Sequence, residues 1–200
     1  MDHIDELARA LSRLPGIGPR QAKRFVYFLL ATPTDERKKL AELISSLRKA
    51  VHQCPECMRY FNGSTATVCS YCSDKMRDDT QLMLVEKDQD LAAVERAGTY
   101  KGRYFVLGGV LTLIGKGVIR EKELLKAVEK RLKTGLKEIV LALSATSEGE
   151  HTTDRVRELL MPSRDHFKIS ELGRGLATGS ELEYSDPETL RAALTNRKET

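Results

Sequence analysis

The cysteines are the residues of this 200-residue chain whose spacing most clearly predicts chemistry. There are four of them, Cys54 and Cys57, then Cys69 and Cys72, in a Cys-x2-Cys-x11-Cys-x2-Cys arrangement. This spacing lets four thiolates meet tetrahedrally at one zinc ion. Two disulfides are the alternative, but we expect no secretory leader, because the N-terminus lacks a basic segment. We therefore predict one structural Zn²⁺ per chain, without an open position for catalysis.

Two neighbouring features bear on the metal module. His52 lies just before Cys54 and is an alternative ligand, although with four thiolates present we expect it to end a helix. Between the cysteine pairs, the run Tyr60-Phe61-Asn62-Gly63-Ser64 predicts a short hairpin, because Asn-Gly accepts the positive φ angles of a type I′ turn.

Length and composition limit the class of protein. Two hundred residues allow one large domain or two to three small ones. Charged residues make up 31% of the chain and Trp is absent, so we expect a mostly aliphatic core. No apolar run approaches the roughly 20 residues that cross a bilayer. We expect a soluble intracellular protein without a membrane partner.

Positive charge is concentrated at the start of the chain. Residues 1–52 hold 10 Lys/Arg and 6 Asp/Glu, so the net charge of +4 belongs to this segment. No acidic residue occurs between Leu7 and Thr34. The cations in that window are Arg9, Arg13, Arg20, Lys23 and Arg24. Such a window is typical of a phosphate-binding surface, and a solvated basic helix face is the alternative.

The same window contains a glycine-rich turn between two predicted helices, residues 3–14 and 21–31. The turn reads Leu14-Pro15-Gly16-Ile17-Gly18-Pro19. Glycines at these positions let backbone N–H groups approach an anion at the start of the second helix. The pattern resembles a helix-hairpin-helix motif, which binds nucleic-acid backbone without reading bases. The candidate DNA-binding residues are Gly16, Gly18, Arg20, Lys23 and Arg24; a tight turn without a ligand is the alternative.

A third helix is expected from an N-cap at Thr34. Its apolar residues recur at helical spacing and predict a buried stripe. They are Leu40, Leu43, Ile44, Leu47 and Val51. Three short helices form a marginal core, so we expect them to pack on the zinc module or on another subunit.

After Asp79 the pattern changes to alternating strands and helices. We expect strands at 82–85, 104–107, 139–143 and 167–169, and helices at 90–97, 121–134 and 151–160. This alternation predicts a parallel sheet with flanking helices, in an α/β multidomain protein that ends in a short helix at 187–194. The expected domains are 1–52 (helix-hairpin-helix), 53–78 (zinc module), 79–165 (parallel sheet) and 166–200 (C-terminal assembly region).

Acidic side chains follow two of the predicted strands. Glu86 ends the first strand with Asp90 close behind, and Glu148 and Glu150 follow the third. A strand-end Glu resembles the Toprim fold, whose enzymes hold Mg²⁺ with that Glu and a later Asp-x-Asp. The chain has no Asp-x-Asp here, and helix capping or surface placement also explains these residues. We therefore expect no enzyme, with a Mg²⁺-dependent nuclease or primase-like activity as the alternative.

The order of these parts resembles the RecR family of bacterial recombination mediators, of which the chain is identified as a divergent member. The matching segments are Leu14–Pro19, Val85-Glu86 with Asp90-Leu91, Gly98-x-Tyr100-x-Gly102-x-Tyr104, Val106–Gly109, Glu148-Gly149-Glu150, and Leu182-Glu183-Tyr184-x-Asp186 with Thr189-Leu190. The chain departs from the family pattern at residues 111–118, at 151–152, at Glu171 and at Ala177.

The resemblance implies a non-enzymatic DNA-repair protein of the bacterial cytoplasm, associated with the nucleoid. It would form a homo-dimer or a tetrameric ring or clamp on single- and double-stranded DNA, and help load the recombinase onto single strands with RecO- and RecF-type partners. It also implies that Arg20, Lys23 and Arg24 contact DNA and that the four cysteines hold zinc. The same resemblance assigns partner binding to an acidic face made by Glu86, Asp90, Glu148 and Glu150. A zinc-stabilised scaffold with protein partners only is a further alternative.

Overall fold

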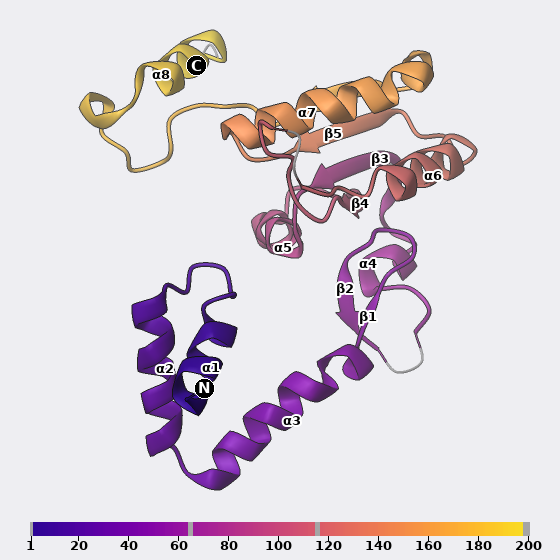
Figure 1. Ribbon diagram of the computed structural model, residues 1–200. Helices are drawn as coiled ribbons and strands as arrows, with labels where there is room; N and C mark the ends of the chain where they lie inside the picture. The colour runs from indigo at the N-terminus through magenta and orange to yellow at the C-terminus, as the bar shows by residue number, and fades with distance from the viewer. Residues whose placement is uncertain (1, 64–65, 115–116, 198–200) are drawn as a thin grey trace. The chain divides into compact units, whose positions relative to one another are not determined.

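The computed structural model describes residues 2–63, 66–114 and 117–197 (Figure 1). The chain divides into two compact units, Met1–His52 and Gln53–Thr200. Each unit is described by itself.

The first unit consists of three helices. They are α1 (His3–Leu11), α2 (Pro19–Ala31) and α3 (Thr34–Ala50). Asp2 caps α1 by accepting a hydrogen bond from the Ile4 N–H at 3.1 Å, and Pro19 occupies the first turn of α2, where its missing N–H costs nothing. The two helices pack closely because their contact is made by the buried residues Ala8, Ala22 and Val26.

The apolar stripe predicted for the third helix is present but uncovered in the single chain. None of the residues of α3 is buried, and Leu43, Ile44 and Leu47 are 59%, 66% and 61% exposed. Val51 does not belong to α3 but begins the next strand, and Thr34 is the first helical residue rather than the N-cap. The reason is geometric: α1 and α2 form their own small core, and a 17-residue helix presents more apolar surface than they cover.

The metal module joins two short strands and one helical turn. Strand β1 (Val51–Gln53), in which the division between the units falls, pairs with β2 (Tyr60–Asn62), and α4 (Ser70–Ser73) follows. The predicted turn at Asn62-Gly63 is wrong, because Asn62 lies in β2 and neither residue has a positive φ; Ser64 lies outside the described residues. The chain reverses instead at the first cysteine pair, where Met58 adopts a φ of 61°.

The second unit is built around a four-stranded parallel sheet, as predicted. Its strands are β3 (Asp78–Val85), β4 (Gly102–Val106), β5 (Glu138–Ala142) and β6 (Lys168–Glu171), in the order β4-β3-β5-β6. All of its pairings are parallel. The connecting helices are α5 (Asp88–Ala97), α6 (Glu121–Leu132) and α7 (Ser147–Leu160).

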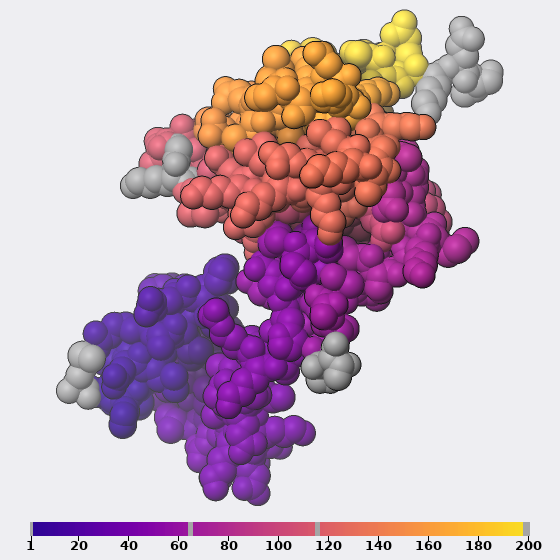
Figure 2. Space-filling model, turned by 90° about the vertical axis from the view of Figure 1, so that its right-hand side faces the viewer, coloured from indigo at the N-terminus to yellow at the C-terminus, as the bar shows by residue number. Residues whose placement is uncertain are grey.

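Helices cover both faces of the sheet. Because side chains alternate along a strand, Leu82 and Leu84 pack on one face with residues of α6 and α7, while Met83 and Val85 pack on the other with Leu91 of α5. The space-filling view shows α6 and α7, coloured salmon to orange, as a continuous cover (Figure 2). The core is mostly aliphatic, as expected, with Tyr104 and Phe105 as its largest members.

The C-terminal segment contains two 3-10 turns, η1 (Met161–His166) and η2 (Leu182–Tyr184), and the helix α8 (Pro187–Thr195). Asp186 caps α8 by accepting hydrogen bonds from the N–H groups of Glu188 and Thr189, at 3.0 and 2.9 Å. Residues 172–181 form neither helix nor strand. Among the described residues, no helix has the length and apolar character needed to span a membrane.

Gly149 is required by close packing at the start of α7. A Cβ atom on Gly149 would lie 1.9 Å from the carbonyl oxygen of Ser144. We expect Gly149→Ala to lower the free energy of unfolding in urea by about 1–3 kcal/mol, because the loop after β5 must shift.

The matched control is Gly173→Ala, since a Cβ there meets nothing within 4 Å. We expect its unfolding free energy to stay within about 0.5 kcal/mol of the parent. Equal stability of the two variants would contradict the packing described for Gly149.

Candidate metal centre and nucleic-acid interface

The four cysteine sulfurs meet at one point of the second unit. The Sγ atoms of Cys54, Cys57, Cys69 and Cys72 all lie within 4.8 Å of one another, and those of Cys57 and Cys69 are 3.6 Å apart. Zinc–sulfur bonds of about 2.3 Å in a tetrahedron require sulfurs separated by about 3.8 Å. Cys72 is half-buried and the other three are buried. The cluster therefore fits a tetrahedral metal ion such as Zn²⁺.

The sulfurs are too close together for all four to ionise without a cation. The interaction between Cys54 and Cys57 lowers the pKa of the Cys54 thiol and raises the pKa of the Cys57 thiol. A thiolate at Cys54 is stabilised by a proton that stays on Cys57. A bound dication removes this conflict by stabilising four thiolates together. The donor set thus favours a soft metal with a closed, structural coordination shell.

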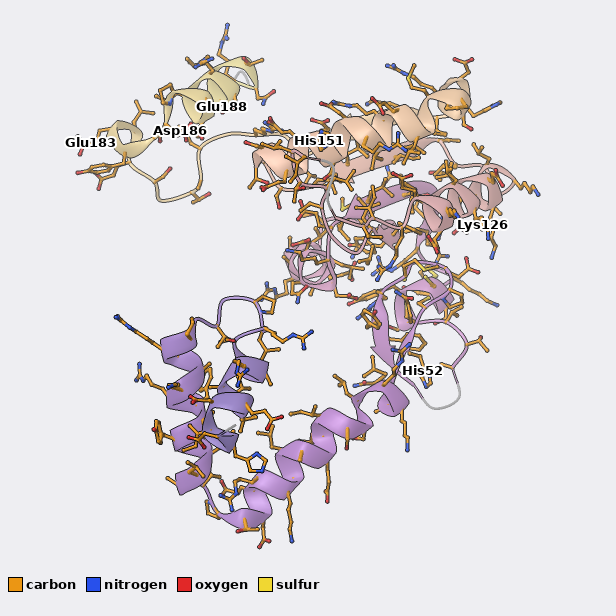
Figure 3. The ribbon with its side chains drawn as sticks, viewed as in Figure 1. His52, Lys126, His151, Glu183, Asp186 and Glu188 are labelled. Atoms are coloured by element: carbon orange, nitrogen blue, oxygen red, sulfur yellow. The ribbon has the colours of Figure 1, made fainter. Side chains whose placement is uncertain are left out.

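His52 does not belong to the cluster. It lies on β1 and is labelled in Figure 3, and the group of possible metal ligands contains the four cysteines alone. In the part of the chain that the structure describes, no other set of three or more His, Cys, Asp or Glu side chains meets in this way.

Backbone carbonyls next to the cysteines fasten the module to the sheet. The Val106 N–H of β4 donates to the Cys57 carbonyl at 2.8 Å, and Arg120 Nη1 donates to the Met58 carbonyl at 3.2 Å. Arg103 Nη1, also from β4, donates to the Cys72 carbonyl at 3.2 Å. Both cysteine loops are therefore docked on β4, and the shape of the metal centre and the position of this strand depend on each other.

The glycine-rich turn leaves the start of α2 open. Gly16 has a φ of +78°, which a side chain would disfavour, and Gly18 precedes the first turn without a side-chain cap. The Ile17 N–H donates to the Leu14 carbonyl at 3.1 Å, which closes the turn. The first N–H groups of α2 thus have no intrahelical partner, and they lie at the positive end of the helix dipole.

The three predicted basic residues lie exposed on the first turns of α2, but they are not equivalent. Arg20 makes no hydrogen bond or ion pair with any described residue, and Arg24 Nη1 donates to Gln21 Oε1 at 3.4 Å. Lys23 Nζ lies 3.0 Å from Asp5 Oδ1 of α1, and this hydrogen bond raises the pKa of Lys23. Sequence reasoning missed Asp5, because it precedes the acid-free window and reaches Lys23 only through helix packing.

Two of the four predicted acidic-face residues, Glu86 and Asp90, accept hydrogen bonds from backbone N–H groups. Glu86 follows β3 and is only 4% exposed, and its Oε1 accepts the Ser144 N–H at 2.6 Å. Asp90 Oδ2 accepts the Lys87 N–H at 2.9 Å and so caps α5. These carboxylates join neighbouring segments of the Toprim-like sheet and its loops.

The other two acidic residues lie on the exposed first turn of α7. Glu150 Oε1 accepts a hydrogen bond from Arg174 Nη1 at 2.7 Å, and Glu148 has an exposed side chain. Because the cysteines are the one ligand group among the described residues, the four carboxylates do not converge as a metal site. Glu86 is buried, Asp90 is half-buried, and Glu148 and Glu150 are exposed.

The fold and the sites place this chain in a class of proteins. Members of this class combine a helix-hairpin-helix, a four-cysteine module and a Toprim sheet. Residues 4–48 match the family described as "RecR, helix-hairpin-helix", 80–172 the Toprim domain, and 175–198 "RecR, C-terminal". The chain belongs to the RecR family.

Full-length relatives agree with this assignment. A protein of Bdellovibrio bacteriovorus named "Recombination protein RecR" is 37% identical, over 98% of this chain and 97% of its own length. Proteins with the same name from Bifidobacterium longum subsp. infantis and Carboxydothermus hydrogenoformans are 37% and 38% identical, each over 98% of this chain and 96% of its own. The resemblance predicted from the sequence is thus confirmed.

The metal centre can be tested by zinc content. We expect about one Zn²⁺ per chain in the parent protein, and Cys54→Ser to lose most of it together with part of its thermal stability, because three ligands bind the ion far less tightly. Zinc released by a mercurial reagent and counted with a chromogenic chelator gives the stoichiometry.

His52→Ala is the control for this experiment. It removes the nearest alternative ligand and should keep the full zinc content. A His52→Ala protein that lost its zinc, or a Cys54→Ser protein that kept it, would contradict the four-thiolate centre.

Proposed function

We propose that this protein is a non-enzymatic recombination mediator in DNA repair that grips the backbone of single- or double-stranded DNA without reading its sequence. The observation that carries the proposal is the open start of α2, where unpartnered N–H groups lie beside the exposed guanidinium of Arg20. Backbone donors and an arginine next to a helix N-terminus form an anion site suited to phosphate. The names of the relatives, recombination proteins, support the same reading.

Within this site the basic residues have graded roles. Arg20 is the principal phosphate contact, because nothing in the described chain competes for its charge. Arg24 lies one turn further along α2 and extends the contact. Lys23 shares its charge with Asp5 and contributes less, unless DNA displaces that carboxylate. Gly16 and Gly18 allow the phosphate to approach the backbone.

The proposal includes self-assembly into a ring or clamp. The first unit contains a cavity of about 670 Å³ whose apolar lining comes from all three of its helices, among them Leu7, Leu11, Leu30, Leu40 and Ile44. With the exposed stripe of α3, this is a large apolar surface for a 52-residue unit, and such surfaces mark protein interfaces. A second copy of the chain is the occupant that we propose.

Partner binding is assigned to the acidic residues that are accessible. Glu148 and Glu150 present charge on α7, where RecO- or RecF-type partners would meet them during loading of the recombinase onto single strands. Glu86 and Asp90 support this region through their hydrogen bonds to Ser144 and Lys87. The protein would act in the cytoplasm, at the nucleoid.

The Mg²⁺-dependent nuclease or primase alternative has weaker support. Paired-metal chemistry needs a fixed cluster of carboxylates about one metal–metal spacing apart. Here Glu86 is engaged by the Ser144 N–H, and Glu150 by Arg174. No second function is favoured by a specific observation.

DNA binding across a salt series tests the site. Fluorescence anisotropy should give sequence-independent binding whose log–log salt slope is about −3 to −4, if about four phosphates are neutralised per subunit. Replacing Arg20, Lys23 and Arg24 with Ala should lower the affinity at least tenfold and flatten the slope.

A charge-matched control removes three exposed lysines of the other unit, Lys75, Lys122 and Lys126, in the same way. This control should change affinity far less than the hairpin variant. Equal losses would mean that binding follows net charge and not the hairpin. Full DNA binding by the hairpin variant would leave the protein-only scaffold as the better account.

Self-assembly is tested on α3. We expect Leu43→Glu with Ile44→Glu to shift the protein toward monomer in light scattering after size exclusion, because buried unpaired carboxylates are costly at an interface. The control, Ser45→Glu with Ser46→Glu, adds the same charge beside the stripe and should keep the parent mass. An unchanged mass for the Leu43, Ile44 variant would show that α3 does not form the interface.

A further inference from the structure

An ion pair joins α1 to α2 beside the glycine-rich turn. The Lys23 Nζ atom lies 3.0 Å from Asp5 Oδ1, and the two side chains are 57% and 49% exposed. The pair is therefore accessible to a ligand from solvent, and one of its members belongs to the basic residues proposed to bind DNA.

A cavity of about 290 Å³ opens at this pair. Its lining residues come from both helices and from the residue that follows α1; they are Asp5, Ala8, Arg9, Ser12, Pro19 and Lys23. Pro19 is the first residue of α2, so the cavity reaches the helix start whose N–H groups lack intrahelical partners. The Asp5 carboxylate thus borders the place where a DNA phosphate is proposed to lie.

Arg9 adds a second cation to the lining. Its Nε donates to the backbone carbonyl of Asp5 at 3.3 Å, and its terminal nitrogens make no hydrogen bond or ion pair with a described residue. Of the charged groups that line the cavity, Lys23 and Arg9 are positive and Asp5 is negative. The cavity therefore has the charge of an anion site, in which a carboxylate of the protein lies against one of the two cations.

A phosphate bound at Lys23 would conflict with the Asp5 carboxylate. An ammonium has three N–H donors and can contact both anions at once. Two contacts of about 3 Å on one nitrogen, however, leave the two anions at most about 6 Å apart, where like charges repel. Binding of DNA therefore has to break the Asp5–Lys23 pair or proceed against this repulsion.

We propose that Asp5 is an internal competitor for the DNA phosphate. In the free protein its carboxylate holds Lys23, and a phosphate that enters the cavity breaks this pair and takes the place of the carboxylate on the ammonium. This proposal rests on the proposed function and adds to it a residue, Asp5, that sets affinity and salt dependence from outside the acid-free window.

The size of the effect follows from the exposure of the pair. Exposed ion pairs are individually weak, so releasing Lys23 from Asp5 should change the DNA affinity by about two- to fivefold. Asp5 therefore lowers the affinity without abolishing binding.

The test is fluorescence anisotropy of the full-length protein with a labelled single-stranded oligonucleotide across a salt series. Asp5→Asn should bind about two- to fivefold more tightly than the parent at low salt. Its log–log salt slope should be steeper by about 0.7, because Lys23 then neutralises one further phosphate. The substitution keeps the contact with Arg9, since Arg9 donates to the backbone carbonyl of Asp5 and not to its carboxylate.

Glu6→Gln is the matched control. Glu6 follows Asp5 in the first turn of α1, and its carboxylate lies 3.5 Å from His3 Nδ1. The control removes the same charge from the same turn, so it measures the effect of net charge alone. We expect it to raise the affinity less than Asp5→Asn does.

A double-mutant cycle shows whether the pair breaks. It compares the parent, Asp5→Asn, Lys23→Ala and the variant with both substitutions. If DNA breaks the pair, the product of the association constants of the two single variants should exceed the product for the parent and the double variant by about two- to fivefold. Charges that act independently would give equal products.

Two results would overturn this proposal while Arg20-dependent DNA binding upholds the proposed function. They are an equal gain of affinity in Asp5→Asn and Glu6→Gln, and equal products in the cycle. Absence of DNA binding by the parent, or binding that Arg20→Ala leaves unchanged, would overturn the proposed function and this proposal with it.

Discussion

The convergence of four sulfurs is the constraint on which the second unit depends. A module of this size cannot bury enough apolar surface to hold its own loops, so a metal ion bound by the four sulfurs would supply that stability. The same loops present carbonyls to Val106, Arg103 and Arg120, all on or next to β4. A change at the metal would therefore reach an edge strand of the sheet directly.

The two units differ in how their basic side chains are paired. The first unit carries an open helix start with an unpartnered Arg20, whereas the second contains several arginines paired with carboxylates, such as Arg103 with Asp79 and Arg155 with Glu121. Glu86 is a buried carboxylate that accepts a hydrogen bond from the Ser144 N–H. This buried charge therefore connects two segments that are far apart in the sequence, the ends of β3 and β5.

Local patterns predicted most of the elements, while long-range contacts escaped prediction. The cysteine spacing and the alternation of strands and helices are local patterns; the four cysteines converge and the strands form one parallel sheet, as they predict. The apolar stripe of α3 was predicted from its helical spacing, but the spacing does not show which surface packs against it. The Lys23–Asp5 pair and the Glu86–Ser144 hydrogen bond depend on helix packing and on β3 lying beside β5. The burial of Arg131 gave no signal, because a basic residue in the last turn of a helix is ordinarily exposed.

X-ray absorption at the zinc edge of the purified, full-length protein tests the central claim most directly. Four thiolates at one ion predict a first shell of four sulfurs at about 2.3 Å, without nitrogen or oxygen. A shell that contains a nitrogen ligand would contradict the cluster as described. So would metal-free protein that is fully folded and whose cysteines resist alkylation until reduced, because its loops would then be held by disulfides.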